Sequence, residues 1–301
     1  SLISIAQEIL DKREQFQVTL GAQGQEDIEA MMALLSVGMS AGGARPKAVL
    51  AFNRDFTRVR SGQTNAPEGF THFVMKFDGV SSNKDKEKED PKGYGAIEYA
   101  YYRMATDAGI NMAPCQLFEE NGRRHFMTKR FDRKGGETKH HIQTFCALKH
   151  FDYNLVNSFS YEQLFQCMRE LRLSYADAEQ MFRRMVFNVI SRNCDDHTKN
   201  FSFILKQSGK WELAPAYDVC HAYRPGSDWV SQHSLSINGK RKDITKSDLL
   251  VIGESIRCKK ASEIIDEINE TVSQWNKYAD AVQVEPNLRD EINRTLVNIN
   301  A

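Results

Sequence analysis

Residues 193–203 read NCDDHTKNFSF, and the segments on either side of them indicate how the chain folds. Before them, the pattern over residues 175–192 predicts a core helix, because its apolar side chains recur at helical spacing. These side chains are Phe182, Met185, Val186 and Val189. After them, residues 201–218 predict a short hairpin that turns at Ser208-Gly209. The quoted segment is therefore a loop between a buried helix and a pair of strands.

The polar residues of this loop have a spacing that suits phosphoryl transfer. Asp195 and Asn200 match the D-x-x-x-x-N pattern of a kinase catalytic loop, whereas Asp196 lies one residue too close to Asn200. A carboxylate there can accept the proton of an attacking hydroxyl, and an amide oxygen can bind Mg²⁺. Asp195 is therefore the predicted catalytic residue. Asp218, at the predicted strand end after Pro215, is expected to bind Mg²⁺ together with Asn200.

The first part of the chain offers candidates for binding phosphate. The helical pattern of residues 27–35 runs into a small-residue loop, residues 40–47, whose glycines allow the backbone to approach an anion. The apolar stretch that follows the loop predicts a strand. Lys47 adds a second phosphate contact to Lys76, which lies on a strand predicted over residues 71–77. Glu98, on a helix predicted over residues 96–108, is expected to orient Lys76.

The order of elements predicts an α+β, two-lobed fold. A charged loop over residues 81–93 and a hairpin that turns at Asn121-Gly122 complete a strand-rich N-lobe, residues 1–130. Beyond Arg133 the pattern changes to helices and predicts a mainly helical C-lobe, residues 131–301. Capping boxes at Ser160 and Ser174 predict the starts of two helices. Later helices are expected to begin near Thr245 and Ser262, and the last carries Ile264, Ile265, Ile268, Val272 and Trp275.

Composition excludes several classes of protein. Lys plus Arg and Asp plus Glu number 40 each, so no net field draws the chain to nucleic acid or to an anionic membrane. No apolar run approaches the ~20 residues of a membrane span, and the N-terminal residues do not read as a signal peptide. The six cysteines form no C-x-x-C pair and predict reduced, buried thiols. We expect a cytoplasmic protein without direct contact to membrane or nucleic acid.

Five motifs together resemble one known family. They are GGARPKA (residues 42–48), Lys76, KRFDR (residues 129–133), NCDDHTKNFSF and LAPAYD (residues 213–218). From about Ser36 to Asp248 the chain is similar to HipA-type serine/threonine kinases, the toxins of HipBA and HipBST modules. The resemblance implies a protein kinase-like fold that uses ATP and Mg²⁺. Few residues precede the Gly-rich loop, which indicates the shorter HipT form or a HipA chain that lacks its N-terminal subdomain.

The resemblance also assigns roles to individual residues. It implies Asp195 as the catalytic base, Asn200 and Asp218 as metal ligands, and Lys76 as a phosphate ligand. The remaining residues that it implies for ATP binding are Ser40, Gly42, Gly43, Ala44, Lys47, Glu98, Lys129, Phe131, Asp132, His197 and Tyr217. Among these, Lys129 and Phe131 would meet adenine through the hinge backbone and Asp132 would lie near the ribose. From the residues alone, Asp132 could equally be a surface carboxylate paired with Arg130 or Arg133, and Tyr217 a core aromatic.

Members of this family are typically autophosphorylated on a serine just before the Gly-rich segment, which corresponds to Ser40, with Ser36 as a second candidate. A phosphate there would repel the phosphates of ATP and switch the kinase off. A plain loop serine is the alternative.

Three functions remain open on the sequence. The first is a type II toxin that transfers the γ-phosphate of ATP to a protein of translation, in the family's case an aminoacyl-tRNA synthetase. Its partners would be a HipB-like DNA-binding antitoxin and, in three-gene modules, a HipS-like small antitoxin. The second is a small-molecule phosphotransferase, and the third is a nucleotide-sensing partner of a DNA-bound antitoxin.

Overall fold

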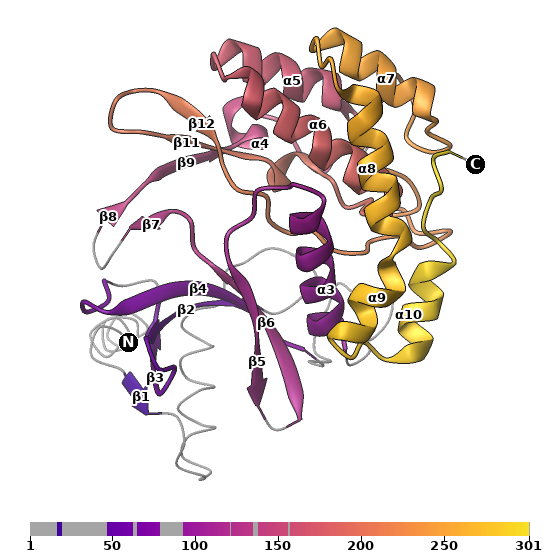
Figure 1. Cartoon of the computed structure of the whole chain (residues 1–301). Helices are drawn as coiled ribbons and strands as arrows, with labels where there is room; N and C mark the ends of the chain where they lie inside the picture. The colour runs from indigo at the N-terminus through magenta and orange to yellow at the C-terminus, as the bar shows by residue number, and fades with distance from the viewer. Residues whose placement is uncertain are drawn as a thin grey trace. The chain divides into compact units, whose positions relative to one another are not determined.

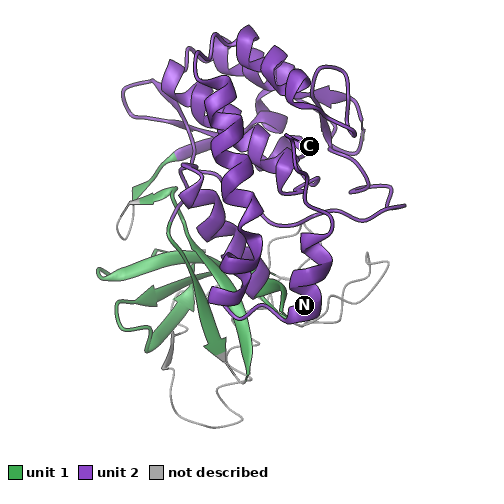
Figure 2. Ribbon diagram, turned by 45° about the vertical axis from the view of Figure 1, so that its right-hand side comes forward, with its two compact units in different colours: residues 1–95, 114–140 green, residues 96–113, 141–301 purple. Residues whose placement is uncertain are grey.

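The structure, a computed structural model, describes residues 17–19, 47–62, 65–78, 93–120, 122–134, 138–155 and 157–300. The chain forms two compact units (Figure 2). Unit 1 comprises Ser1–Gly95 and Pro114–His140, and unit 2 comprises Ala96–Ala113 and His141–Ala301. Residues 96–113, which we placed in the N-lobe, thus group with unit 2. That the units act as a nucleotide lobe and a catalytic lobe stays a prediction.

Unit 1 is built on a six-stranded antiparallel sheet in the order β1-β3-β2-β4-β6-β5 (Figure 1). The strands are β1 Gln17–Thr19, β2 Lys47–Asn53, β3 Arg58–Ser61, β4 Phe70–Lys76, β5 Cys115–Glu120 and β6 Arg123–Lys129. The strands predicted after the Gly-rich loop and over residues 71–77 are confirmed as β2 and β4. The hairpin predicted around Gly122 is confirmed as β5 and β6. Strands β1 and β3 were not predicted, because β3 carries two arginines and reads as a polar connection.

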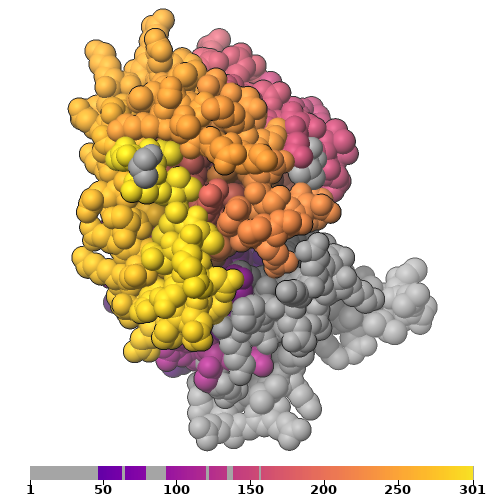
Figure 3. Space-filling model, turned by 90° about the vertical axis from the view of Figure 1, so that its right-hand side faces the viewer, coloured from indigo at the N-terminus to yellow at the C-terminus, as the bar shows by residue number. Residues whose placement is uncertain are grey.

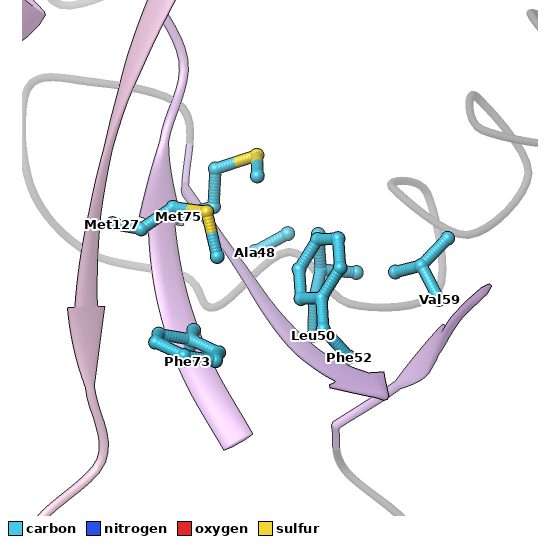
Figure 4. Packing of buried hydrophobic residues seen from close by; sticks show 7 residues of the cluster. All are labelled: Ala48, Leu50, Phe52, Val59, Phe73, Met75 and Met127. Carbon is cyan, nitrogen blue, oxygen red and sulfur yellow. The ribbon is translucent and has the colours of Figure 1, made fainter. Parts of the chain in front are cut away.

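Alternate residues of neighbouring strands form the apolar core of unit 1. Leu50 lies opposite Phe73 and Ala48 opposite Met75 in the β2–β4 register. Figure 4 shows this cluster, which consists of Ala48, Leu50, Phe52, Val59, Phe73, Met75 and Met127. Each large side chain buried in this way contributes about 1.5–3 kcal/mol, and a shift of one residue would expose the whole set. The core therefore fixes the register of β2 against β4.

The described α-helices belong to unit 2, except that α3 begins two residues before it, at Tyr94. They are α3 Tyr94–Asp107, α4 Phe145–Leu148, α5 Tyr161–Glu170, α6 Tyr175–Ile190, α7 Lys246–Ser255, α8 Ala261–Ser273, α9 Trp275–Ala281 and α10 Pro286–Asn293. The predicted capping boxes at Ser160 and Ser174 are confirmed, and Thr245 caps α7 in the same way. The helix predicted from Ser262 is wrong at its far end. It stops at Ser273, and Trp275 begins the separate helix α9.

The mainly helical pattern predicted after Arg133 is confirmed, but this part of the chain also contains short strands that we did not predict. The hairpin is confirmed as β11 Ser202–Leu205 and β12 Trp211–Leu213, but β9 His141–Thr144 pairs with it to make a three-stranded sheet. Strands β10 Phe159–Ser160 and β13 Leu235–Ser236 form a parallel pair, and β7 Arg133–Lys134 pairs with β8 Thr138–Lys139. These strands are two to four residues long, and most pair with residues far along the chain, so local periodicity does not reveal them.

The end of α6 is anchored from two sides within unit 2. The hydroxyl of Tyr101, in α3, donates to the carbonyl of Ser191 at 2.7 Å. The amide of Val297 donates to the carbonyl of Ile190 at 3.0 Å, which brings the C-terminal residues back onto α6. In Figure 3 these C-terminal residues (yellow) form a continuous part of the surface of unit 2. The loop that follows α6 therefore starts from a fixed point.

None of the six cysteines forms a disulfide. Cys146, Cys167, Cys194 and Cys258 are buried as predicted, whereas Cys115 and Cys220 are half-buried, so the prediction of burial is wrong for these two. In the part of the chain that the structure describes, no helix has both the length and the apolar character needed to cross a membrane.

Candidate functional site

The loop between α6 and β11 places Asp195 beside Asn200. The side-chain amide of Asn200 donates from Nδ2 to the carbonyl oxygen of Asp195 at 2.7 Å. Because a carbonyl can only accept, this bond fixes the orientation of the amide and leaves Oδ1 as the end that can bind a metal. The Asp195 side chain is 52% exposed, and its Oδ1 lies 3.8 Å from Nε2 of His197. His197 in turn accepts from the amide of Lys199 and caps the short 3-10 turn Thr198–Asn200.

The neighbouring carboxylate, Asp196, faces the interior instead. Its side chain is fully buried and accepts hydrogen bonds from the hydroxyl of Tyr161 at 2.7 Å and from Nδ1 of His233 at 2.9 Å. The backbone amide of Ser234 donates a third bond at 2.8 Å. Two adjacent aspartates thus have opposite environments, and only Asp195 is accessible to a substrate. Sequence reasoning missed the role of Asp196, Tyr161 and His233, since no local pattern connects them.

A concave pocket in unit 2 brings the predicted metal ligands together. Asn200 and Asp218 both line it, together with Asn193, Asp196, Arg184 and Tyr217. Our prediction that Asp218 lies at a strand end is wrong, because β12 ends at Leu213. Asp218 is instead held after an isolated bridge between Ala216 and Met112 and has a φ of 52°. A left-handed backbone at a residue other than glycine costs about 1–2 kcal/mol and is concentrated at functional sites.

Tyr217 and Arg184 support the backbone around the pocket. The Tyr217 hydroxyl donates to the carbonyl of Lys199 at 2.6 Å and also bonds Ser202 Oγ, and burial raises the pKa of this phenol. Buried Arg184 donates to the carbonyl of Ala214 at 2.8 Å, and its burial lowers its pKa to about 10. Tyr217 therefore ties the loop to the segment that carries Asp218. That it also lines the nucleotide stays a prediction.

The residues present fit a magnesium ion. Within the described residues no group of three or more His, Cys, Asp or Glu side chains could hold a metal ion. Mg²⁺, however, is usually bound by one or two protein oxygens, with waters and substrate phosphates completing the octahedron. Asn200 Oδ1 and the carboxylate of Asp218 are two such hard donors on one pocket.

In unit 1, two predicted phosphate ligands lie across from each other. The β2–β4 register pairs Lys47 with Lys76, and the ammonium of Lys76 lies 5.8 Å from the ring centroid of Phe126. Two lysines therefore lie directly opposite each other at this end of the two strands. Glu98 lies on α3, as expected, and is buried, but it belongs to unit 2, and its pairing with Lys76 stays a prediction.

The predicted hinge residues follow β6. Lys129, the last residue of β6, has an exposed side chain, and its amide donates to the carbonyl of Pro114 at 2.9 Å. Asp132 is paired with both Arg130 (2.7 Å) and Arg133 (2.8 Å), which confirms the pairing, but the residue is buried and so is not a surface carboxylate. Burial alone would raise the pKa of Asp132, but the two arginines hold it below its ordinary value. The adenine and ribose contacts of Lys129, Phe131 and Asp132 stay predictions.

Part of the predicted site lies outside the described residues. This holds for Ser36, Ser40, Gly42, Gly43 and Ala44, and for the helix predicted over residues 27–35. Their roles stay predictions.

Comparison with known proteins places this geometry in a family. Residues 39–275 match the family described as HipA-like C-terminal domain. The chain is 27% identical over 126 residues to Y4mE of Sinorhizobium fredii, a match that covers 39% of this chain and 30% of that protein. It is also 27% identical over 142 residues to the serine/threonine-protein kinase toxin HipA of Shewanella oneidensis, covering 40% of this chain and 33% of that protein. The chain thus matches about a third of the length of these relatives.

A solved structure shares the fold. A chain in the complex of the Shewanella oneidensis MR-1 toxin-antitoxin system HipA, HipB and its operator DNA aligns with a TM-score of 0.65 and 18% identity. The alignment covers 95% of this chain and 68% of that chain. It confirms the predicted α+β architecture. Since the family match covers residues 39–275 of 301, the chain belongs to the HipA-like C-terminal domain family.

Proposed function

We propose that this chain is a HipA- or HipT-like serine/threonine protein kinase, the toxin of a type II toxin-antitoxin system, that uses ATP and Mg²⁺. The observation that carries the proposal is the arrangement of three side chains in unit 2. Asp195 is exposed, Asn200 is fixed against its carbonyl with the amide oxygen turned away, and Asp218 shares a pocket with Asn200. This is the set of a base and two hard ligands that phosphoryl transfer requires.

Each side chain has a role in the proposed reaction. The carboxylate of Asp195 orients the acceptor hydroxyl and accepts its proton as the γ-phosphate is transferred. Asn200 and Asp218 would hold Mg²⁺, which when bound neutralises charge on the phosphates. Lys47 and Lys76, which lie opposite each other in the β2–β4 register, bind those phosphates.

The other nucleotide contacts that we propose are those that the family resemblance implies. Lys129 and Phe131 meet the adenine through their backbone, Asp132 lies near the ribose, and His197 and Tyr217 line the nucleotide. Glu98 orients Lys76. The backbone of Gly42, Gly43 and Ala44 covers the phosphates, and Ser40, with Ser36 as second candidate, is the autophosphorylated residue that switches the kinase off.

The proposed partners follow from the relatives. The matched Shewanella protein carries the name of a serine/threonine-protein kinase toxin, and the chain of similar fold comes from a complex with HipB and operator DNA. We infer a HipB-like DNA-binding antitoxin as partner and, in a three-gene module, a HipS-like small antitoxin. The acceptor would be a protein of translation such as an aminoacyl-tRNA synthetase.

The test compares the purified chain with its Asp195→Asn variant. Both are incubated with Mg²⁺ and γ-labelled ATP, alone and with a cell lysate, and analysed by intact mass and by gel. Wild type should gain a phosphate and label a protein band, and Asp195→Asn should do neither. Glu212→Gln, which removes an exposed carboxylate paired with Lys206, is the matched control and should behave as wild type. Labelled metabolites without labelled protein would instead indicate a small-molecule phosphotransferase.

A further inference from the structure

A buried ion pair lies directly behind the loop that carries Asp195. The side chains of Asp196 and His233 are 0% and 2% exposed, and Nδ1 of the imidazole donates to Oδ2 of the carboxylate at 2.9 Å. Burial alone would lower the pKa of His233, but the charge and hydrogen bond of Asp196 raise it to about 10. The interaction with Asp196 therefore favours the protonated form of the His233 imidazole. Neither residue belongs to the base, the metal ligands or the nucleotide contacts proposed above.

The pair is part of a network that reaches both neighbouring helices. Tyr161, the first residue of α5, donates its hydroxyl to Asp196 and accepts a hydrogen bond from Nδ2 of Asn188 in α6 at 3.1 Å. Asn188 accepts in turn from Asn193, at the start of the loop, at 2.9 Å. A carboxylate that accepts several bonds in a dry site has one position, since any other would leave a donor or a charge unpaired. Asp196 is thus fixed in the interior.

The segment that contains His233 also holds Cys194, the residue before Asp195. Ser234 donates from its hydroxyl to the carbonyl of Cys194 at 3.2 Å, and from its amide to Asp196 at 2.8 Å. The carbonyl of Asp195 accepts from Asn200. Residues 194, 195 and 196 are therefore all held by hydrogen bonds. Cys194 and Asp196 are buried, whereas Asp195 between them is exposed, so its side chain points away from those of its two neighbours. Turning Asp196 inward turns Asp195 outward.

The backbone around His233 is anchored independently of its imidazole. The His233 amide donates to the carbonyl of Arg241 at 2.9 Å, and Arg241 donates to the carbonyl of Phe159 at 3.0 Å. The pairing of β10 with β13 holds the residues that follow. Removing the imidazole therefore changes one side chain and leaves the surrounding backbone anchored.

We propose that His233 is a positioning residue for phosphoryl transfer, whose positive charge holds Asp196 in the interior and thereby presents Asp195 to the acceptor hydroxyl. The inference rests on the proposed kinase function. It assigns a role in the reaction to a residue 38 positions beyond the catalytic aspartate that never touches the substrate. Loss of this role lowers kcat, because the base is misplaced, and leaves the KM for ATP unchanged, because His233 makes no nucleotide contact.

The test uses His233→Asn, in which the amide Nδ2 can replace the Nδ1 donor while the charge is lost. The enzyme concentration is corrected for the fraction of molecules that bind nucleotide. We then expect kcat to fall about 100-fold, which is the effect of misplacing a reacting group by ~1 Å. The KM for ATP should stay within about twofold of the wild-type value. The double variant Asp196→Asn/His233→Asn removes both charges and should recover at least about tenfold of the lost kcat, because no unpaired buried charge remains. His141→Asn, at an exposed histidine, is the matched control.

The outcomes separate this inference from the proposed function. A wild-type chain without phosphotransfer would overturn both. An active wild type with kcat per nucleotide-binding molecule unchanged in His233→Asn would overturn the positioning role alone and leave His233 as a structural residue. If His233→Asn does not fold, Tyr161→Phe decides, since it removes one bond to Asp196 and keeps the packing. An unchanged kcat in that variant overturns the inference, and a severalfold fall at constant KM supports it.

Discussion

Replacing Asp196 by Asn should destabilise unit 2, whereas the same change at its neighbour Asp195 should destroy activity and leave stability almost unaltered. The two substitutions are chemically identical and one residue apart. They differ in burial, because the Asp196 side chain is fully buried and that of Asp195 is 52% exposed. Comparing the two variants therefore tests directly whether the two carboxylates have opposite environments.

The expected loss of stability in Asp196→Asn follows from its ion pair with His233. A histidine whose pKa is raised from ~6.5 to about 10 by a buried carboxylate stabilises the folded state at pH 7 by about 4 kcal/mol. Removing one partner of a buried ion pair typically costs about 3–5 kcal/mol, which agrees. Asp196→Asn should therefore lower the free energy of unfolding by about 4 kcal/mol. Asp195→Asn should lower it by less than about 1 kcal/mol, as expected for an exposed group, and should reduce kcat by about 10²–10⁴-fold.

Urea unfolding, monitored by tryptophan fluorescence, measures the free energy of unfolding. The three tryptophans, Trp211, Trp229 and Trp275, all belong to unit 2, so the signal reports on the unit that contains the pair. The same samples are assayed for transfer of labelled phosphate. Equal unfolding free energies for the two variants, or full phosphotransfer by Asp195→Asn, would refute the assignment of the buried and the catalytic carboxylate.

Other changes test the packing and the pH dependence. Gly253→Val should destabilise unit 2 by about 1–3 kcal/mol in urea unfolding, because a Cβ there would lie 2.6 Å from Cβ of Ala261 and α7 would have to move away from α8. The control Val251→Ala, on the exposed face of α7, should have little effect. Equal unfolding midpoints for the two variants would contradict this packing. Trp275→Phe should lower the free energy of unfolding by about 3 kcal/mol, because it opens a cavity and leaves the Arg289 carbonyl without its 2.9 Å hydrogen bond from the indole. An unfolding midpoint within error of wild type would show that the site repacks. Stability should also depend on pH: the pKa of His233 is raised to about 10, so its contribution is complete below ~6.5, the unfolded value, and is lost as pH rises through 10. Since Cys194 and Arg241 also face the Asp196–His233 pair, the comparison is with His233→Asn, whose stability should fall less steeply over the same range.

Local chemistry explains the elements that sequence analysis predicted. The capping boxes at Ser160 and Ser174 and the hairpin at Gly122 depend on residues at most a few positions apart, and all three are confirmed. Strand β9 was missed because its four residues have no turn signal and find their partner, β11, about 60 positions later. The break between α8 and α9 was missed because the apolar spacing continues across Gln274.

The sequence by itself determined which residue types are available to the site and their spacing, from the small-residue loop to the Asp195-to-Asn200 interval and Asp218. Spacing is a local property and can be read along the chain. The tertiary structure decided which of two adjacent aspartates is exposed, because that depends on Tyr161 and His233, 35 and 37 positions away from Asp196. It also placed Lys47 opposite Lys76, since the packing of Leu50 against Phe73 sets the register. Burial and register depend on contacts between distant residues, and only folding brings those residues together.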